Sequence, residues 1–149
     1  MFIAIKGRLA GKAYGGIYVR IRIDPLDKLV SEYIRRRSGG CCERCGTYHD
    51  WKGLQASHFI GRSNRAVRYD PDNLAALCYG CHSYFHGHPL EHVEWFKNRM
   101  GGAYDLLLAR SRVIAKPDRA ALGIYYKCQI HALKSGGLFT TKEGINDRL

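Results

Sequence analysis

The fold of this chain is decided by residues 42–88, which read CERCGTYHDWKGLQASHFIGRSNRAVRYDPDNLAALCYGCHSYFHGH. The stretch begins with the pair Cys42 and Cys45 and contains the pair Cys78 and Cys81 near its other end, and two residues separate the cysteines of each pair. Four thiolates that meet would form the tetrahedral sulfur site that Zn²⁺ prefers. The spacing therefore predicts a structural zinc ion that ties the two ends of the stretch together and contributes directly to folding.

Three other interpretations of the paired cysteines stay open at this point. Redox-active pairs are disfavoured because no thioredoxin-like βαβ pattern surrounds either pair. Disulfides are disfavoured because the opening MFIAIK has no basic region before a long apolar stretch, so we expect no secretory signal. Residues 78–82 also fit the C-x-x-C-H pattern of haem attachment, a short pattern that arises easily where a zinc-binding pair precedes a histidine. Cys41 and Cys128 are left without a predicted role.

Between the cysteine pairs, short apolar runs are separated by polar sequence. Residues 54–59 and 74–77 are expected to form two strands, and the polar, basic residues 61–72 are expected to form the loop that joins them. A helix is expected to begin at residues 81–86. The stretch therefore predicts two strands followed by a helix.

The sequence around this stretch reads as mainly helical. A helix is expected from Pro25, with Asp24 as its N-cap, to the glycines at 39–40. Its apolar face would consist of Leu26, Leu29, Val30, Tyr33 and Ile34. Further helices are expected at 89–100, 103–113 and 117–133. Residues 17–23 alternate strictly between apolar and polar and predict a half-buried strand, paired with residues 1–5.

These elements predict one α+β domain over residues 1–149. An N-terminal strand and helix would occupy 1–37, the zinc-stabilised core 38–100, the C-terminal helices 101–135 and a loose tail 136–149. The length of 149 residues suits a single core.

The charge of the chain narrows the class of partner. Lys and Arg number 24 against 13 Asp and Glu, a net charge of +11, and the isoelectric point is near 9.6. A small domain this basic favours a nucleic-acid partner over an anionic membrane, because no basic amphipathic helix with an aromatic face is present. No apolar run approaches the length of a membrane span, and a cytoplasmic location is expected.

A second pattern lies between and after the cysteine pairs. It consists of His58, Asn73, His82 and His86, with 14, 8 and 3 residues between successive members. A histidine can act as general base near neutral pH. His82 and His86 lie four residues apart on the expected helix, so both imidazoles fall on one face and form a platform for a metal ion. Asn73 can hold the loop against the base or bind the ion.

This pattern resembles the motif of the HNH nucleases, also called ββα-metal or His-Me finger nucleases. The flanking cysteine pairs are similar to those of zinc-stabilised phage HNH proteins. The segments SHFIGR, RYDPDNLAALCYGCH and GHPLE look most like phage recombination proteins of the NinG type. The resemblance covers about residues 38–100.

The resemblance implies a metal-dependent endonuclease that hydrolyses DNA phosphodiester bonds in phage recombination or DNA processing. It implies His58 and Asn73 as catalytic residues, with His58 as the general base. It also implies His82 and His86 as ligands of a catalytic Mg²⁺, Mn²⁺ or Zn²⁺ ion, in addition to the structural zinc. A location in the host cytoplasm follows if the protein is phage-encoded.

Position 57 departs from the family pattern. The HNH families place Asp or His there as the first metal ligand, and serine is a weak ligand. Water, phosphate oxygens or Asp70 would then have to complete the shell of the ion. Ser57 therefore keeps a second hypothesis open, a zinc-dependent DNA-binding module of the same fold that no longer cleaves. A homing-type or packaging-associated nuclease is a third hypothesis, which a strict recognition site would reveal.

Basic residues in the loop between His58 and Asn73 are expected to contact DNA phosphates. They are Arg62, Arg65 and Arg68. The strand arginines Arg20 and Arg22 and the helix arginines 35–37 would extend this track. Nothing resembles a base-reading helix, so we expect a preference for DNA structure rather than strict sequence specificity. The resemblance to phage recombination proteins implies branched DNA or a junction between single and double strands as the substrate.

Overall fold

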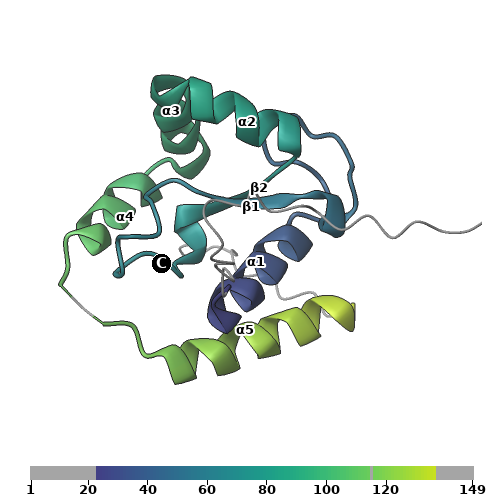
Figure 1. Ribbon diagram of the computed structural model, residues 1–149, viewed down its shortest axis with the longest axis vertical. Coiled ribbons are helices and arrows are strands. Elements are labelled where there is room, and N and C mark those ends of the chain that lie inside the picture. Colours follow the sequence, from purple (N-terminus) through teal and green to yellow (C-terminus); the bar gives the residue numbers. More distant parts are fainter. Residues whose placement is uncertain (1–22, 115, 137–149) are drawn as a thin grey trace, which may run out of the picture.

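The computed structural model describes residues 23–114 and 116–136 of the chain, and its fold is the predicted α+β (Figure 1). The expected pairing of residues 1–5, almost all of the strand at 17–23, Arg20, Arg22 and the tail beyond 136 lie outside these residues. The elements in chain order are α1 (Pro25–Arg37), η1 (Trp51–Gly53), β1 (Gln55–His58), η2 (Pro71–Asn73), β2 (Leu74–Leu77), α2 (Tyr79–Gly87), α3 (Pro89–Met100), α4 (Ala103–Ser111) and α5 (Arg119–Lys134).

Helix α1 forms as its sequence signals predict. The Asp24 carboxylate accepts a hydrogen bond from the backbone N–H of Leu26 at 2.9 Å, and Pro25 occupies the first helical turn. The predicted apolar face is confirmed, since Leu26, Val30 and Ile34 are all buried. The helix therefore supplies one wall of the core.

Strands β1 and β2 form an antiparallel pair in which Gln55 lies opposite Leu77 and His58 opposite Leu74. Every residue of β2 is buried, because the pair lies between α2 on one side and α1 on the other (Figure 1). The continuous apolar run at 74–77 is typical of a strand that is covered on both faces. The register places His58 at the end of the pair where β1 stops.

The C-terminal helices differ from the prediction only at their ends. Helix α3 has the expected bounds, and α4 ends at Ser111 rather than at residue 113. Helix α5 begins at Arg119 rather than at Pro117, because the Asp118 carboxylate caps it by accepting from the backbone N–H groups of Ala120 and Ala121 at 3.0 Å each.

Helix α5 lies along the side of α1 that faces away from the strands, and it buries Tyr126 and Ile130 (Figure 1). Across the parts of the chain that the structure describes, no helix combines the length and the apolar character that crossing a membrane would require.

Candidate functional site

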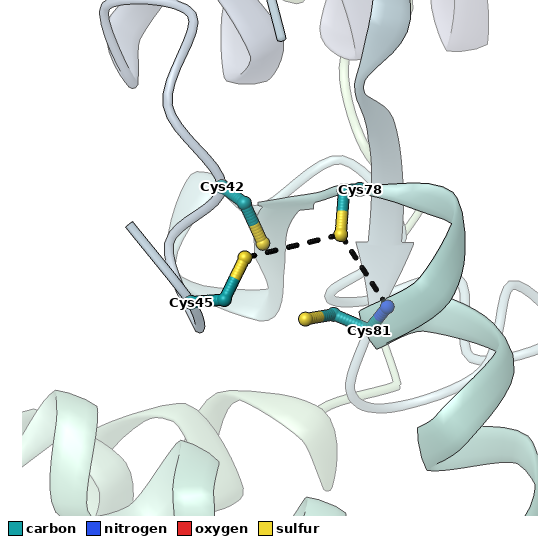
Figure 2. A group of neighbouring side chains, drawn as sticks. All are labelled: Cys42, Cys45, Cys78 and Cys81. Atoms are coloured by element: carbon teal, nitrogen blue, oxygen red, sulfur yellow. Dashed lines mark hydrogen bonds between the residues drawn. The ribbon is translucent and has the colours of Figure 1, made fainter. Parts of the chain in front are cut away.

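The two cysteine pairs meet at one point of the fold. The sulfur atoms of Cys42, Cys45, Cys78 and Cys81 all lie within 4.8 Å of one another. Figure 2 shows the first two on the loop after α1 and the other two where the chain enters α2. Because each pair contributes half of one group, the arrangement is consistent with a structural zinc site and not with two independent redox pairs. Cys41 is outside this group, as the spacing predicted.

Hydrogen-bond donors around the sulfur atoms suit bound thiolates, whereas the burial of Cys81 opposes the ionisation of its thiol. The Sγ atom of Cys78 caps α2 by accepting from the backbone N–H of Cys81 at 3.4 Å. The Nη1 atom of Arg44 lies 3.8 Å from the Sγ of Cys81, where its positive charge offsets the negative charge of the sulfur cluster. Burial raises the pKa of Cys81 to about 12, whereas hydrogen bonding to Thr47 lowers the pKa of Cys45 to about 6. A four-sulfur donor set of this kind fits Zn²⁺.

His58, the predicted general base, has one ring nitrogen fixed by the loop. Its Nε2 atom lies 3.0 Å from the backbone carbonyl oxygen of Arg68. A carbonyl oxygen can only accept, so Nε2 carries the proton and Nδ1 carries the lone pair. Burial lowers the pKa of His58, and the nearby charge of Arg62 lowers it further. The imidazole is therefore neutral at pH 7 and able to accept a proton at Nδ1.

Asn73, the predicted partner of the base, is fully buried. Its Oδ1 atom accepts from the backbone N–H of Ile60 at 2.7 Å, and its Nδ2 atom donates to the carbonyl oxygens of Ile60 and Val67, both at 2.9 Å. Both ends of the amide are thus engaged with the backbone. Of the two roles that the sequence left open, this geometry favours holding the loop over binding an ion.

His82 and His86 lie side by side on α2. The centroids of their rings are 4.8 Å apart, as expected for residues one helical turn apart. Burial lowers the pKa of His82, and the charges of His86 and Arg62 act in the same direction. His86 is exposed and His82 is half-buried. Two imidazoles in this arrangement can offer two nitrogen ligands to a divalent ion.

Gln55 was missed by the sequence reasoning. Its Oε1 atom lies 2.5 Å from the Nδ1 of His82, so the amide accepts the Nδ1 proton and leaves the lone pair on Nε2. This is the outer contact that a metal-binding histidine usually makes. The sequence did offer one signal for Gln55. It lies two residues before position 57, the first-ligand position of the family pattern, and therefore on the same face of β1.

Ser57 is buried on β1, opposite Ala75. Asp70, one of the groups expected to complete the shell of the ion, is engaged elsewhere. Its carboxylate accepts from the backbone N–H of Asp72 at 2.9 Å and from the Nε of Arg110 at 2.7 Å. Within 23–114 and 116–136, the four cysteines are the one group of three or more His, Cys, Asp or Glu side chains with converging ligand atoms. Among the described residues, His82 and His86 therefore offer two protein ligands, and no third His, Cys, Asp or Glu converges with them.

The arginines predicted to contact DNA differ in whether their guanidinium groups are already bound to other parts of the protein. Arg62 and Arg65 are exposed in the loop. Arg68 instead donates to both carboxylate oxygens of Asp27, at 3.1 and 2.5 Å, so its guanidinium joins the loop to α1. Arg37 likewise donates to the carbonyl oxygens of Pro71 and Leu74, at 3.0 and 2.8 Å. The last two side chains hold the structure together, which leaves Arg62 and Arg65 as the loop cations open to a phosphate.

Comparison with known proteins adds one finding to this geometry. A family model described as HNH endonuclease matches residues 42–87, less than a third of the chain. The matched segment contains both cysteine pairs, β1, β2 and α2. Searches of the curated proteins and of the solved structures return no match.

Proposed function

We propose that the chain is a metal-dependent endonuclease that hydrolyses phosphodiester bonds in DNA. The observation that carries the proposal is the state of His58. It stands at the end of β1 with Nε2 bound to the Arg68 carbonyl and its lone pair on Nδ1, within the segment that matches the HNH endonuclease model. A neutral, oriented imidazole is what a general base requires.

In the proposed reaction, Nδ1 of His58 removes a proton from a water molecule as the water oxygen attacks the phosphorus atom. The bond from phosphorus to the 3′-oxygen breaks, and this oxygen takes a proton from solvent. The products are a 5′-phosphate and a 3′-hydroxyl, and the imidazolium returns its proton to solvent. Asn73 keeps the loop closed against the base, and the exposed guanidinium of Arg62 attracts the phosphate.

The proposal assigns a divalent ion to the Nε2 of His82 and to the His86 ring. When bound, such an ion neutralises charge on the phosphate and on the departing oxygen. Imidazole ligands suit Zn²⁺ better than Mg²⁺ or Mn²⁺, which prefer oxygen. Among the three ions that the family resemblance implies, the donor set therefore favours Zn²⁺.

The biological setting belongs to the same proposal. A role in phage DNA recombination, a location in the host cytoplasm, and branched or junction DNA as the substrate all rest on the resemblance described above. The domain limits of 38–100 for the core are proposed on the same basis. The net charge of +11 supports a DNA partner of any shape.

One observation supports a second candidate, a DNA-binding module without cleavage. Ser57 occupies the first-ligand position and is buried, and the described residues offer no third protein ligand beside His82 and His86. If water and phosphate oxygens do not complete the shell of the ion, the fold would bind DNA without cutting it.

Nicking of a supercoiled plasmid separates the two candidates. The protein is purified with its structural zinc and dialysed free of loosely bound ions, and Zn²⁺, Ni²⁺, Mn²⁺ and Mg²⁺ are then added separately. The proposal expects ion-dependent nicks that DNA ligase can reseal, because they carry a 5′-phosphate and a 3′-hydroxyl. Salt-sensitive DNA binding without cleavage of plasmid or branched DNA, with any ion, would establish the binding module instead.

A further inference from the structure

We propose that Tyr48 and Trp51 form a platform on which an unpaired base of single-stranded DNA stacks. The inference rests on the proposed function for its DNA substrate and adds the class of DNA structure that the protein selects. The two side chains, named here the aromatic platform, follow the first cysteine pair and belong to no part of the catalytic site.

The aromatic platform borders a pocket of about 230 Å³. Its lining residues are Arg36, Gly39, Gly40, Tyr48, Asp50, Trp51 and Leu133. Tyr48 is 69% exposed, although its backbone is held by a regular contact. That contact is the antiparallel bridge between Tyr48 and Cys41. A solvent-facing ring on a fixed backbone is suited to stacking, because little freedom is lost when a base binds.

Gly40 fixes the position of the Tyr48 ring. A Cβ atom at Gly40 would lie 2.8 Å from the Cε2 atom of Tyr48, so the ring rests directly against the glycine backbone. The φ angle of Gly40 is +80°, a conformation that other residues rarely adopt. The positive φ angle and the close approach of the Tyr48 ring therefore each require a glycine at position 40.

Cations surround the tryptophan of the platform. The guanidinium carbons of Arg36 and Arg35 lie 3.9 and 5.0 Å from the centroid of the Trp51 ring, and the Nζ of Lys52 lies 5.8 Å from it. Aromatic rings with interleaved cations are the usual means of binding single-stranded nucleic acid, since bases stack and phosphates pair with the cations.

Two carboxylates lie near these cations, and both already have partners. Glu32 accepts from the Nε of Arg36 at 2.8 Å and from the Nζ of Lys134 at 3.2 Å. Asp50 accepts from the backbone N–H of Trp51 at 2.6 Å. Lys52 is exposed and forms no ion pair among the described residues. Arg36 is therefore already paired with Glu32, whereas Arg35 and Lys52 form no ion pair among the described residues and are the cations available to a phosphate.

The number of residues between Trp51 and the proposed general base His58 limits the distance between the aromatic platform and His58. Trp51 and His58 are seven residues apart, which spans at most about 25 Å even when fully extended. Duplex DNA rises about 3.4 Å per base pair, so this distance corresponds to about seven base pairs. A strand held on the aromatic platform would place the cut within about seven base pairs of the unpaired base.

The chain contains two tryptophans, which allows the platform to be observed directly. In full-length protein carrying Trp95→Phe, all tryptophan fluorescence comes from Trp51. This protein is titrated with a twelve-residue oligothymidylate, with a blunt duplex of the same length and with oligouridylate. The titrations are repeated with Tyr48→Ala and with Tyr79→Ala, a matched control because Tyr79 is 73% exposed at the start of α2. Zinc content and thermal unfolding verify that each variant is folded.

The proposal expects the single strand to quench Trp51 strongly and the duplex to quench it weakly. Tyr48→Ala should weaken single-strand binding about tenfold to hundredfold, and Tyr79→Ala should leave it unchanged. Equal binding of single strand and duplex, equal effects of the two tyrosine variants, or stronger binding of oligouridylate would overturn it. Because binding is measured without cleavage, intact nicking with no quenching would refute the platform alone. Quenching without nicking would refute the nuclease alone.

Discussion

The Nε2 atom of His58 and the backbone carbonyl oxygen of Arg68 lie 3.0 Å apart, which fixes the tautomer of the imidazole. The same loop residue is held at its other end, because the Arg68 guanidinium donates to both oxygens of Asp27 on α1. The proton position on His58 is therefore connected through one residue to the first helix of the fold. The pairing with Asp27 explains why the Arg68 guanidinium, which was expected to contact DNA, is turned toward the protein.

Replacing Asn73 with alanine should destabilise the protein and open the loop. The change removes three hydrogen bonds to the backbone of Ile60 and Val67, and each lost bond costs about 1 kcal/mol. We expect the free energy of unfolding to fall by about 3 kcal/mol in urea denaturation. Asn98→Ala, at an exposed position of α3, should change it by less than about 0.5 kcal/mol. Equal stability of the two variants would show that Asn73 does not hold the loop.

Gln55→Ala should weaken binding of the second divalent ion without removing the structural zinc. The variant loses the acceptor that keeps the proton of His82 on Nδ1, and losses of outer contacts of this kind cost about tenfold to hundredfold in affinity. Gln55→Glu keeps an acceptor at this position and should bind close to the wild-type affinity. Calorimetric titration with Zn²⁺ of protein already holding its structural zinc measures both. If alanine and glutamate bind the ion equally well, the contact has no role in orienting His82.

The exposed loop cations should determine the salt dependence of DNA binding. Removing one phosphate contact lowers the slope of log affinity against log salt concentration by about one unit, so Arg65→Ala and Arg62→Ala should each show this loss. The effect should be similar for all DNA sequences. Fluorescence anisotropy over a range of salt concentrations measures it.

Two further variants serve as comparisons for this measurement. Lys127→Ala, exposed on α5, should leave the slope unchanged. Arg68→Ala should lower the free energy of unfolding, because Asp27 loses its partner, and should have little effect on the slope. A full-unit loss of slope in Arg68→Ala with no loss in Arg65→Ala would reverse the assignment made here.

Loss of the structural zinc should unfold the core. Structural zinc contributes about 10–16 kcal/mol of apparent binding free energy in small domains, comparable to the whole stability of a protein of this size. Cys42→Ser should therefore abolish the cooperative thermal transition and the bound zinc measured by mass spectrometry. Cys128→Ser, at an exposed position outside the cluster, should retain both. A folded, zinc-free Cys42→Ser protein would contradict the structural role.

The elements that follow local rules were predicted closely from the sequence. The N-cap Asp24, the apolar run at 74–77 and the spacing of Cys42 and Cys45 each act over a few residues, and the structure contains the helix, the buried strand and the sulfur cluster that they indicate. The convergence of the two cysteine pairs follows from the two-strand connection between them.

Contacts between distant side chains could not be predicted in the same way. The bonds of Arg68 to Asp27 and of Gln55 to His82 join residues 41 and 27 positions apart. The sequence spacing of neither pair indicates that its two side chains meet, because these contacts depend on how α1 and α2 pack against the strands. This is why the sequence predicted Arg68 as a DNA contact and did not single out Gln55.

The most direct test of the account is the cleavage of supercoiled plasmid by His58→Ala across a range of pH, beside wild type and His131→Ala. His131 is exposed on α5 and should be dispensable. We expect His58→Ala to lose about a hundredfold to ten-thousandfold in rate. Because burial lowers the pKa of His58, its imidazole stays neutral below the ordinary value near 6.5. The wild-type rate should therefore begin to fall only below that pH. Undiminished cleavage by His58→Ala, or a rate that already falls above pH 6.5, would contradict the assignment of His58 as the general base.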